Sequence, residues 1–236
     1  SGSMAPCIDG VRRNIGSFLD GLASDANRKI DCRIDYLAHS CSEDFSAFRA
    51  ETLRTRDFEC MNSLYGQGPK PEKFFSTDAA EIRKGLEQVE VFGDEAVLVA
   101  IDLCLDFPWR PRGQCHRVVA VLTDEPFESN ALAQSHKHMI GPLIEKIHAL
   151  GVMLFLVAPK SAGYDELSEA DKCQFQQVGQ MHDGLSSLDF ARVLAHIGKS
   201  VSVATPFQGG AEKPVKRALF NQSDWQRGTK AIIGGK

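Results

Sequence analysis

The sequence predicts an α/β fold of three layers, in which helices cover both faces of a mostly parallel central sheet. Two short apolar runs, residues 117–123 and 152–158, are rich in β-branched side chains, which is typical of strands buried on both faces. Segments with helical spacing of apolar residues alternate with these runs along the chain. Because parallel strands need crossover connections, this alternation favours a parallel sheet between two layers of helices.

Five segments are predicted to be helices, because their apolar residues recur every three or four positions or because capping residues open them. They are residues 8–22, 76–89, 95–106, 134–150 and 188–197. Gly151 follows the fourth segment at the position where glycine commonly ends a helix.

The remaining segments are a third strand, a mixed region and a tail. Residues 29–39 alternate between apolar and polar, which predicts a strand with one buried face. Residues 40–71 are polar and mixed and end in a Gly/Pro loop, so they predict no regular element. We expect one domain over residues 1–200 and an irregular, Gly/Pro-containing tail over residues 201–236.

The charge distribution argues against nucleic acid as a partner. The net charge is −4, whereas nucleic-acid binders usually have a strong basic excess. From Lys199 to Lys236 there are seven basic and two acidic residues, a net charge of +5, which leaves −9 for the rest. A basic tail on an acidic body is expected to fold back or to reach an acidic partner.

The cysteines and the apolar runs indicate a cytoplasmic protein. The seven cysteines are scattered without a Cys-x-x-Cys pair, which favours a reducing compartment and argues against a zinc site. No apolar run reaches the ~18 residues of a membrane span, and the first residues lack the apolar core of a signal peptide. We therefore expect no membrane partner.

Oxygen ligands for a cation are found at two places. Asp124 directly follows the strand predicted at residues 117–123, and in open α/β sheets ligands bind beyond the carboxyl ends of the strands. Carboxylates there suit a hard cation such as Mg²⁺. Ser1 and Ser3 immediately precede the first helix, where their hydroxyls are either helix caps or cation ligands.

Two stretches resemble the von Willebrand factor A domain family, in particular its intracellular, often bacterial members. Ser1-Gly2-Ser3-Met4 before a helix resembles the family's D-x-S-G-S-M motif. Residues 93–126, with a glycine before a helix and a strand ending in Leu122-Thr123-Asp124, are similar to its later half. The resemblance covers residues 1–200 in the order and length of the elements.

The resemblance implies a Rossmann-like fold and a metal-ion-dependent adhesion site. In that family, Mg²⁺, or Mn²⁺ in its place, is bound by serines and an aspartate of the first motif, by a middle loop and by a last aspartate. Matching positions here are Ser1, Ser3, Asp94 and Asp124, with Glu95 as an alternative to Asp94. A carboxylate of a partner protein completes the coordination shell in the family.

Two features of the family are not in the sequence: the first aspartate, two residues before Ser1, and the central first strand. Three interpretations remain. The natural protein has a further amino-terminal piece; Ser-Gly-Ser precedes a true start at Met4; or another chain or a changed connectivity supplies the strand. Since a parallel sheet without its central strand has two unpaired edges, we expect some segment to fill the position, with the tail as one candidate.

The function predicted from these features is that of a protein-binding adaptor or scaffold inside an intracellular multiprotein system, not an enzyme. The alternative is a metal-assisted phosphoester hydrolase, for which Asp94, Asp124 and Glu125 are available but no paired catalytic motif is present. A purely structural subunit is the third possibility.

Three minor features are interpreted as structural. His136 and His138 point to different sides of a helix and so predict surface residues rather than a metal site. Trp109 is predicted to anchor a turn. The apolar residues of the tail are expected to dock on this domain or on another protein: Phe207, Leu219, Phe220 and Trp225.

Overall fold

The computed structural model describes most of the chain up to residue 204. The described residues are 4–23, 30–42, 48–54, 74–90, 93–111, 113–129, 133–179, 185 and 188–204. Ser1, Ser3 and residues 205–236 of the predicted tail therefore lie outside the described residues, whereas residues 201–204, predicted as the start of that tail, belong to a helix.

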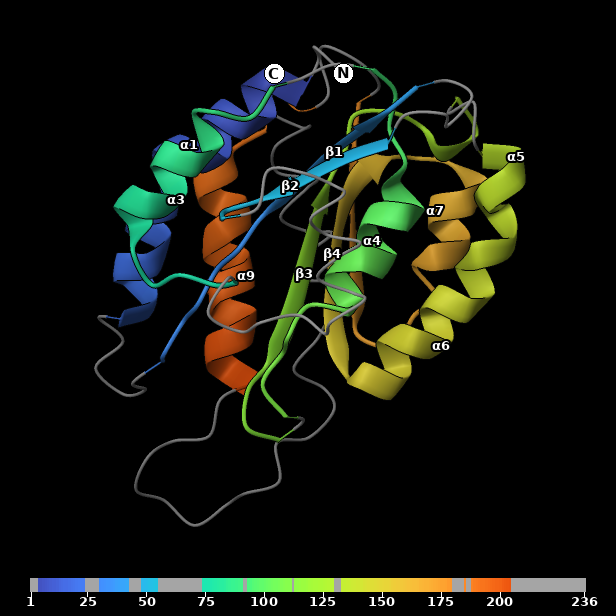
Figure 1. Ribbon diagram of the computed structural model, residues 1–236. Coiled ribbons are helices and arrows are strands. Elements are labelled where there is room, and N and C mark those ends of the chain that lie inside the picture. Colours follow the sequence, from blue (N-terminus) through green and yellow to red (C-terminus); the bar gives the residue numbers. More distant parts are fainter. Residues whose placement is uncertain are drawn as a thin grey trace, which may run out of the picture.

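A three-stranded parallel sheet forms the centre of the fold (Figure 1). Its strands are β3 (Arg117–Leu122), β4 (Val152–Pro159) and β5 (Cys173–Val178), in the order β3-β4-β5. Leu122 lies opposite Val157, and Leu154 lies opposite Cys173. All eight residues of β4 are buried, because it has a neighbour on each edge and helices over both faces. Both apolar runs of the sequence are thus strands, as predicted.

Helices cover both faces of this sheet, which confirms the predicted α/β class with a parallel sheet. On one face lie α4 (Val97–Leu105), α6 (Ile140–Leu150) and α7 (Ala162–Leu167), packed through a core that includes Ile101, Leu143 and Leu156. On the other face lie α1 (Ala5–Ala23) and α9 (Phe190–Ala204), with Phe155 and Val193 in the core between them. Of the helices in the described part of the chain, none is long and apolar enough to cross a membrane.

The structure divides one predicted helix into shorter elements. The segment predicted as one helix over residues 134–150 is divided into α5 (Ala133–His136), the 3-10 turn η4 (Lys137–Met139) and α6. Gly151 ends α6 in the left-handed conformation at φ 66°, as expected. A second 3-10 turn, η3 (Phe127–Ser129), follows β3.

An antiparallel hairpin replaces the third predicted strand. β1 (Leu37–Cys41) pairs with β2 (Phe48–Thr52), Leu37 opposite Thr52. The predicted strand at residues 29–39 is therefore mostly extended chain, with a single bridge from Ile34 to Ser76. The prediction that residues 40–71 hold no regular element was wrong for β2. This strand is defined by its pairing with β1, and its own residues show no strand pattern.

Helix α3 (Ala79–Leu86) packs beside α1. Asp78 caps it by accepting a hydrogen bond from the backbone N–H of Ala80 at 2.8 Å, in agreement with the predicted cap. Ile15 and Leu19 of α1 contact Ile82 and Leu86 of α3 within one apolar cluster. The helix predicted at residues 76–89 is thus present but shorter at both ends.

Asp35 ties three segments together. Its carboxylate accepts hydrogen bonds from the backbone N–H groups of Tyr36 (2.8 Å), Leu53 (2.9 Å) and Phe75 (3.1 Å). Burial raises the pKa of Asp35, and the three backbone donors oppose that rise. One side chain therefore holds the extended chain against the end of β2 and the segment before α3.

Replacement of Asp35 by alanine should lower the free energy of unfolding by about 2–3 kcal/mol, because three backbone N–H groups lose a charged acceptor. Urea denaturation measures this. Asp31→Ala is the matched control: Asp31 is half exposed and pairs with Arg33 and Arg110 at the surface. That control should cost less than about 1 kcal/mol. Equal losses in the two variants would contradict the role of Asp35.

Candidate functional site

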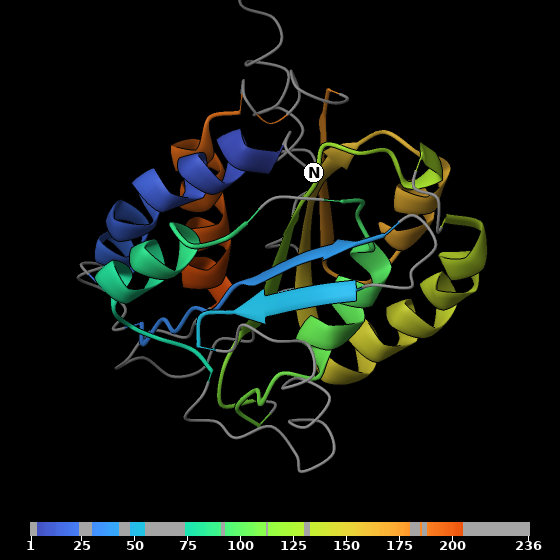
Figure 2. The ribbon, with the colours of Figure 1, turned by 45° about the horizontal axis from the view of Figure 1, so that its top comes forward.

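Four carboxyl groups gather where β3 ends. Asp124 and Glu125 follow the strand, and Asp94 and Glu95 lie in the loop before α4. Their charges act on one another: Asp94 and Asp124 each raise the pKa of both Glu95 and Glu125. The site therefore lies at the carboxyl edge of the parallel sheet, the edge at which open α/β sheets bind ligands. The first turn of α1 (Ala5–Ala23), dark blue in Figure 2, lies at the same edge.

The loop before α4 is fixed by the β1 hairpin. The backbone N–H of Asp94 donates to the carbonyl of Cys41 at 2.8 Å, and Cys41 donates to the carbonyl of Asp94 at 3.0 Å. Gly93 has φ 64°, and a Cβ on it would lie 2.4 Å from the Cys41 carbonyl oxygen. Only glycine fits this close approach, and the pairing sets which way the next residue points.

Glu95 is the acid that this loop directs into the protein. Its side chain is 4% exposed, and one carboxylate oxygen accepts a hydrogen bond from the hydroxyl of Thr123. The other oxygen, Oε1, is buried without a hydrogen-bond partner among the described residues. Burial raises the pKa of Glu95 to about 7; the Thr123 bond opposes the rise, and the charge of Asp124 adds to it.

Asp124 and Glu125 complete the cluster. Asp124 is only 2% exposed. Glu125 is half-buried, and its backbone N–H donates to the Thr123 hydroxyl at 3.2 Å. Partial burial raises the pKa of Glu125 to about 7, and the charges of Asp94, Glu95 and Asp124 raise it further. Thr123 thus connects the end of β3 to the loop before α4.

The walls of the site are Tyr164 of α7 and Cys7 of α1. Tyr164 is buried, and both its burial and the charge of Glu95 raise the pKa of its phenol, while a hydrogen bond with Thr123 opposes that rise. Burial, followed by the charges of Glu95 and Asp124, raises the pKa of the Cys7 thiol well above its usual range. A thiol in such surroundings stays protonated and is a poor nucleophile.

The structure thus brings together two of the four predicted metal ligands. Asp124 is buried in the cluster, whereas Asp94 is half-buried and its side chain accepts from the backbone N–H of Glu95 at 3.2 Å. Ser1 and Ser3 lie outside the described residues. Among the residues that the structure describes, no three His, Cys, Asp or Glu side chains are grouped closely enough to hold a metal ion.

The sequence suggested Glu95 only as an alternative to Asp94, and Thr123, Tyr164 and Cys7 were not predicted. Thr123 alone had a signal, because it directly precedes Asp124 at the end of the apolar run. Tyr164 and Cys7 come from helices far away in the sequence, and no local pattern marks them.

Trp109 has the structural role that was predicted. Its indole N–H donates to the carbonyl of Cys104 at 2.9 Å, and its ring packs against Phe75 with 5.0 Å between centroids. It anchors the turn after α4. His136 and His138 lie in α5 and η4, outside any metal-binding group in the described residues.

No protein-family model matches the sequence, and no curated protein matches it.

The pKa of Glu95 predicts a stability that falls as pH rises. Its folded pKa of about 7 lies above the ordinary value of 4.5, so its contribution is complete below about pH 4.5 and is lost as pH rises through 7. Glu95→Gln should remove this loss, about 2–3 kcal/mol between pH 5 and pH 8. Urea denaturation at both pH values measures it. The exposed Glu166→Gln serves as control, and equal pH slopes in wild type and Glu95→Gln would refute the assignment.

Proposed function

We propose that this chain is a protein-binding adaptor or scaffold domain of the von Willebrand factor A type, which recognises its partner through a divalent cation. The observation that carries the proposal is the pair of buried carboxyl groups, Glu95 and Asp124, at the carboxyl edge of a parallel sheet. The alternation of helices and parallel strands and the Leu122-Thr123-Asp124 sequence also support it. A cytoplasmic, intracellular assembly is the setting that the scattered cysteines favour.

The chemistry of the cluster favours a hard cation. Buried carboxylates that repel one another are costly unless a positive charge compensates them. Mg²⁺ and Mn²⁺ are bound by carboxylate and hydroxyl oxygens, which this edge supplies. Asp124 and Glu95 are the inner ligands in this proposal; Asp94, Ser1 and Ser3 are the further candidates.

The partner would bind at this cation. Mg²⁺ retains open or water-filled positions when a protein supplies only a few carboxylates. An acidic side chain of a partner protein can take such a position, and its negative charge would be repelled by the cluster in the absence of the cation. Partner binding is therefore expected to depend on the cation, and a glutamate or aspartate is expected to be its central contact.

Titration calorimetry with Mg²⁺ and with Mn²⁺ tests this proposal. Wild type should bind, while Asp124→Asn and Glu95→Gln should bind at least about tenfold more weakly, since each removes a negatively charged ligand. Binding should strengthen from pH 6 to pH 8, because Glu95, with a pKa of about 7, must lose its proton.

Glu166→Gln on the surface is the control and should bind like wild type. If neither wild type nor Asp124→Asn shows a heat of cation binding, the proposal is contradicted. Hydrolysis of a generic phosphoester that disappears in Asp124→Asn would instead support the alternative enzyme.

A further inference from the structure

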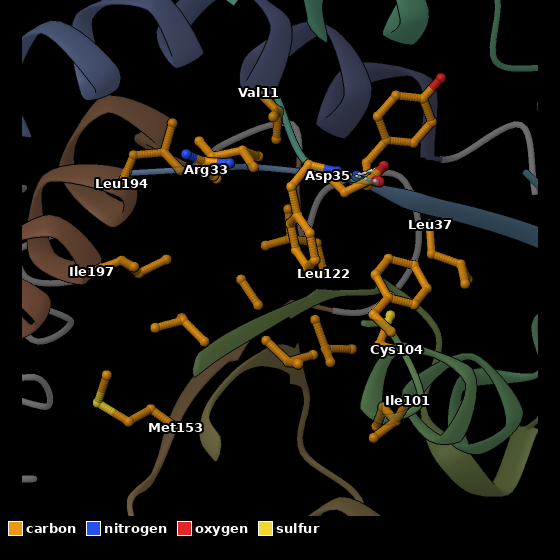
Figure 3. A pocket seen from close by; sticks show the side chains of 18 of the residues that line it. Val11, Arg33, Asp35, Leu37, Ile101, Cys104, Leu122, Met153, Leu194 and Ile197 are labelled. Atoms are coloured by element: carbon orange, nitrogen blue, oxygen red, sulfur yellow. Dashed lines mark hydrogen bonds between the residues drawn. The ribbon is translucent and has the colours of Figure 1, made fainter. Parts of the chain in front are cut away.

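The side chain of Thr123 lies on the face of the sheet that α4 and α7 cover. Leu122, one residue earlier, lines a large cavity beside α1 and packs with the apolar cluster of α1 and α9 on the opposite face (Figure 3). The backbone N–H of Thr123 donates to the carbonyl of Val157 at 3.0 Å, so the strand pairing continues through this residue. Because successive side chains of a strand point to opposite faces, Thr123 is directed to the start of α4, where Glu95 lies.

The hydroxyl of Thr123 is fixed by two hydrogen bonds. A threonine hydroxyl has a single proton to donate. In Thr123 that proton is donated to Glu95, while the hydroxyl oxygen accepts from the backbone N–H of Glu125 at 3.2 Å. Thr123 is 1% exposed, so bulk water does not reach the hydroxyl. The contact with Glu125 therefore keeps the proton directed at Glu95.

One oxygen of Glu95 is left for a further ligand. Oε2 accepts the hydrogen bond from Thr123, whereas Oε1 is buried without a hydrogen-bond partner among the described residues. The backbone of the loop is paired with Cys41, which fixes the position of Glu95 from its other end. A cation at this edge of the sheet is therefore expected to contact Glu95 in a monodentate manner, through Oε1.

The number of carboxylate oxygens at a site distinguishes Mg²⁺ from Ca²⁺. Ca²⁺ binds about six to eight oxygens and often takes both oxygens of one carboxylate. Mg²⁺ is smaller, requires nearly octahedral geometry and keeps several waters beside one or two carboxylates. Among the described residues, no three His, Cys, Asp or Glu side chains are close enough to share a metal ion. Two carboxylates, each contributing one oxygen, suit Mg²⁺ better than Ca²⁺.

We propose that Thr123 determines the cation specificity of the carboxylate cluster. Its hydroxyl occupies Oε2 of Glu95, keeps that carboxylate monodentate and so makes the site select Mg²⁺ over Ca²⁺. Thr123 acts through Glu95 and is therefore a positioning residue. Without the hydroxyl, both oxygens of Glu95 are free to turn to a cation, and a bidentate carboxylate suits the larger ion. Since this role requires that the cluster bind a divalent cation, the inference rests on the proposed function.

Titration calorimetry with Mg²⁺ and with Ca²⁺ on wild type, Thr123→Val and Thr123→Ser tests the proposal. Wild type should bind Mg²⁺ more tightly than Ca²⁺. In Thr123→Val, which lacks the hydroxyl, the ratio of the Kd for Ca²⁺ to the Kd for Mg²⁺ should fall at least about tenfold, because Ca²⁺ gains an oxygen ligand. Thr123→Ser retains the hydroxyl and should restore the wild-type ratio.

Thr52→Val is the matched control. It removes another buried threonine hydroxyl, at the end of the β1–β2 hairpin opposite to Cys41, and it should leave the ratio unchanged. A second measurement needs no variant. In crystals of the wild-type protein grown with Mn²⁺, Oε1 of Glu95 should contact the ion, and Oε2 should still accept from Thr123.

Two results would overturn the proposal. One is the same ratio of dissociation constants in wild type and in Thr123→Val. The other is a wild-type crystal in which both oxygens of Glu95 contact the ion. A cation is bound in either case, so both results leave the proposed function intact. If wild type binds neither Mg²⁺ nor Ca²⁺, the proposed function fails and the role of Thr123 fails with it.

Discussion

The parallel pairing of β3 with β4 is the interaction on which the rest of the structure depends. It sets the register in which Leu122 lies opposite Val157, and so it fixes where Thr123, Asp124 and Glu125 leave the sheet. The same pairing uses one edge of β3, and the other edge has no neighbouring strand among the described residues. The position of the carboxylate cluster therefore follows from a single ladder of hydrogen bonds. A change of register by one residue would exchange the sheet faces on which Val119 and Ala120 lie. It would also displace the carboxylate cluster that follows β3.

The site combines carboxyl groups, whose burial costs free energy, with groups that hold these carboxyl groups in place. Glu95 is held by the hydroxyl of Thr123, and the backbone of its loop is held by Cys41. Its pKa of about 7 makes the charge of the cluster depend on pH in the neutral range. A cation would remove this dependence by favouring the deprotonated form. Stability and pH are thus linked through one side chain, and the proposed cation would be linked to both.

Sequence reasoning succeeded where the signal was local. The apolar runs of β3 and β4 and the caps at Asp78 and Gly151 are visible in a few neighbouring residues. The hairpin was missed because β2 is defined by its pairing with β1, not by its own pattern. The sequence also does not show which of the adjacent acids, Asp94 or Glu95, points inward. That choice depends on the pairing of Asp94 with Cys41, a contact between residues 53 positions apart.

An anomalous difference map from crystals grown with Mn²⁺ tests the central claim most directly, because it locates the cation without reference to affinity. The account predicts one strong peak at the carboxyl edge of β3, in direct contact with carboxylate oxygens of Asp124 and Glu95. An otherwise well-ordered map with no peak there, or with manganese only at surface carboxylates, would contradict it.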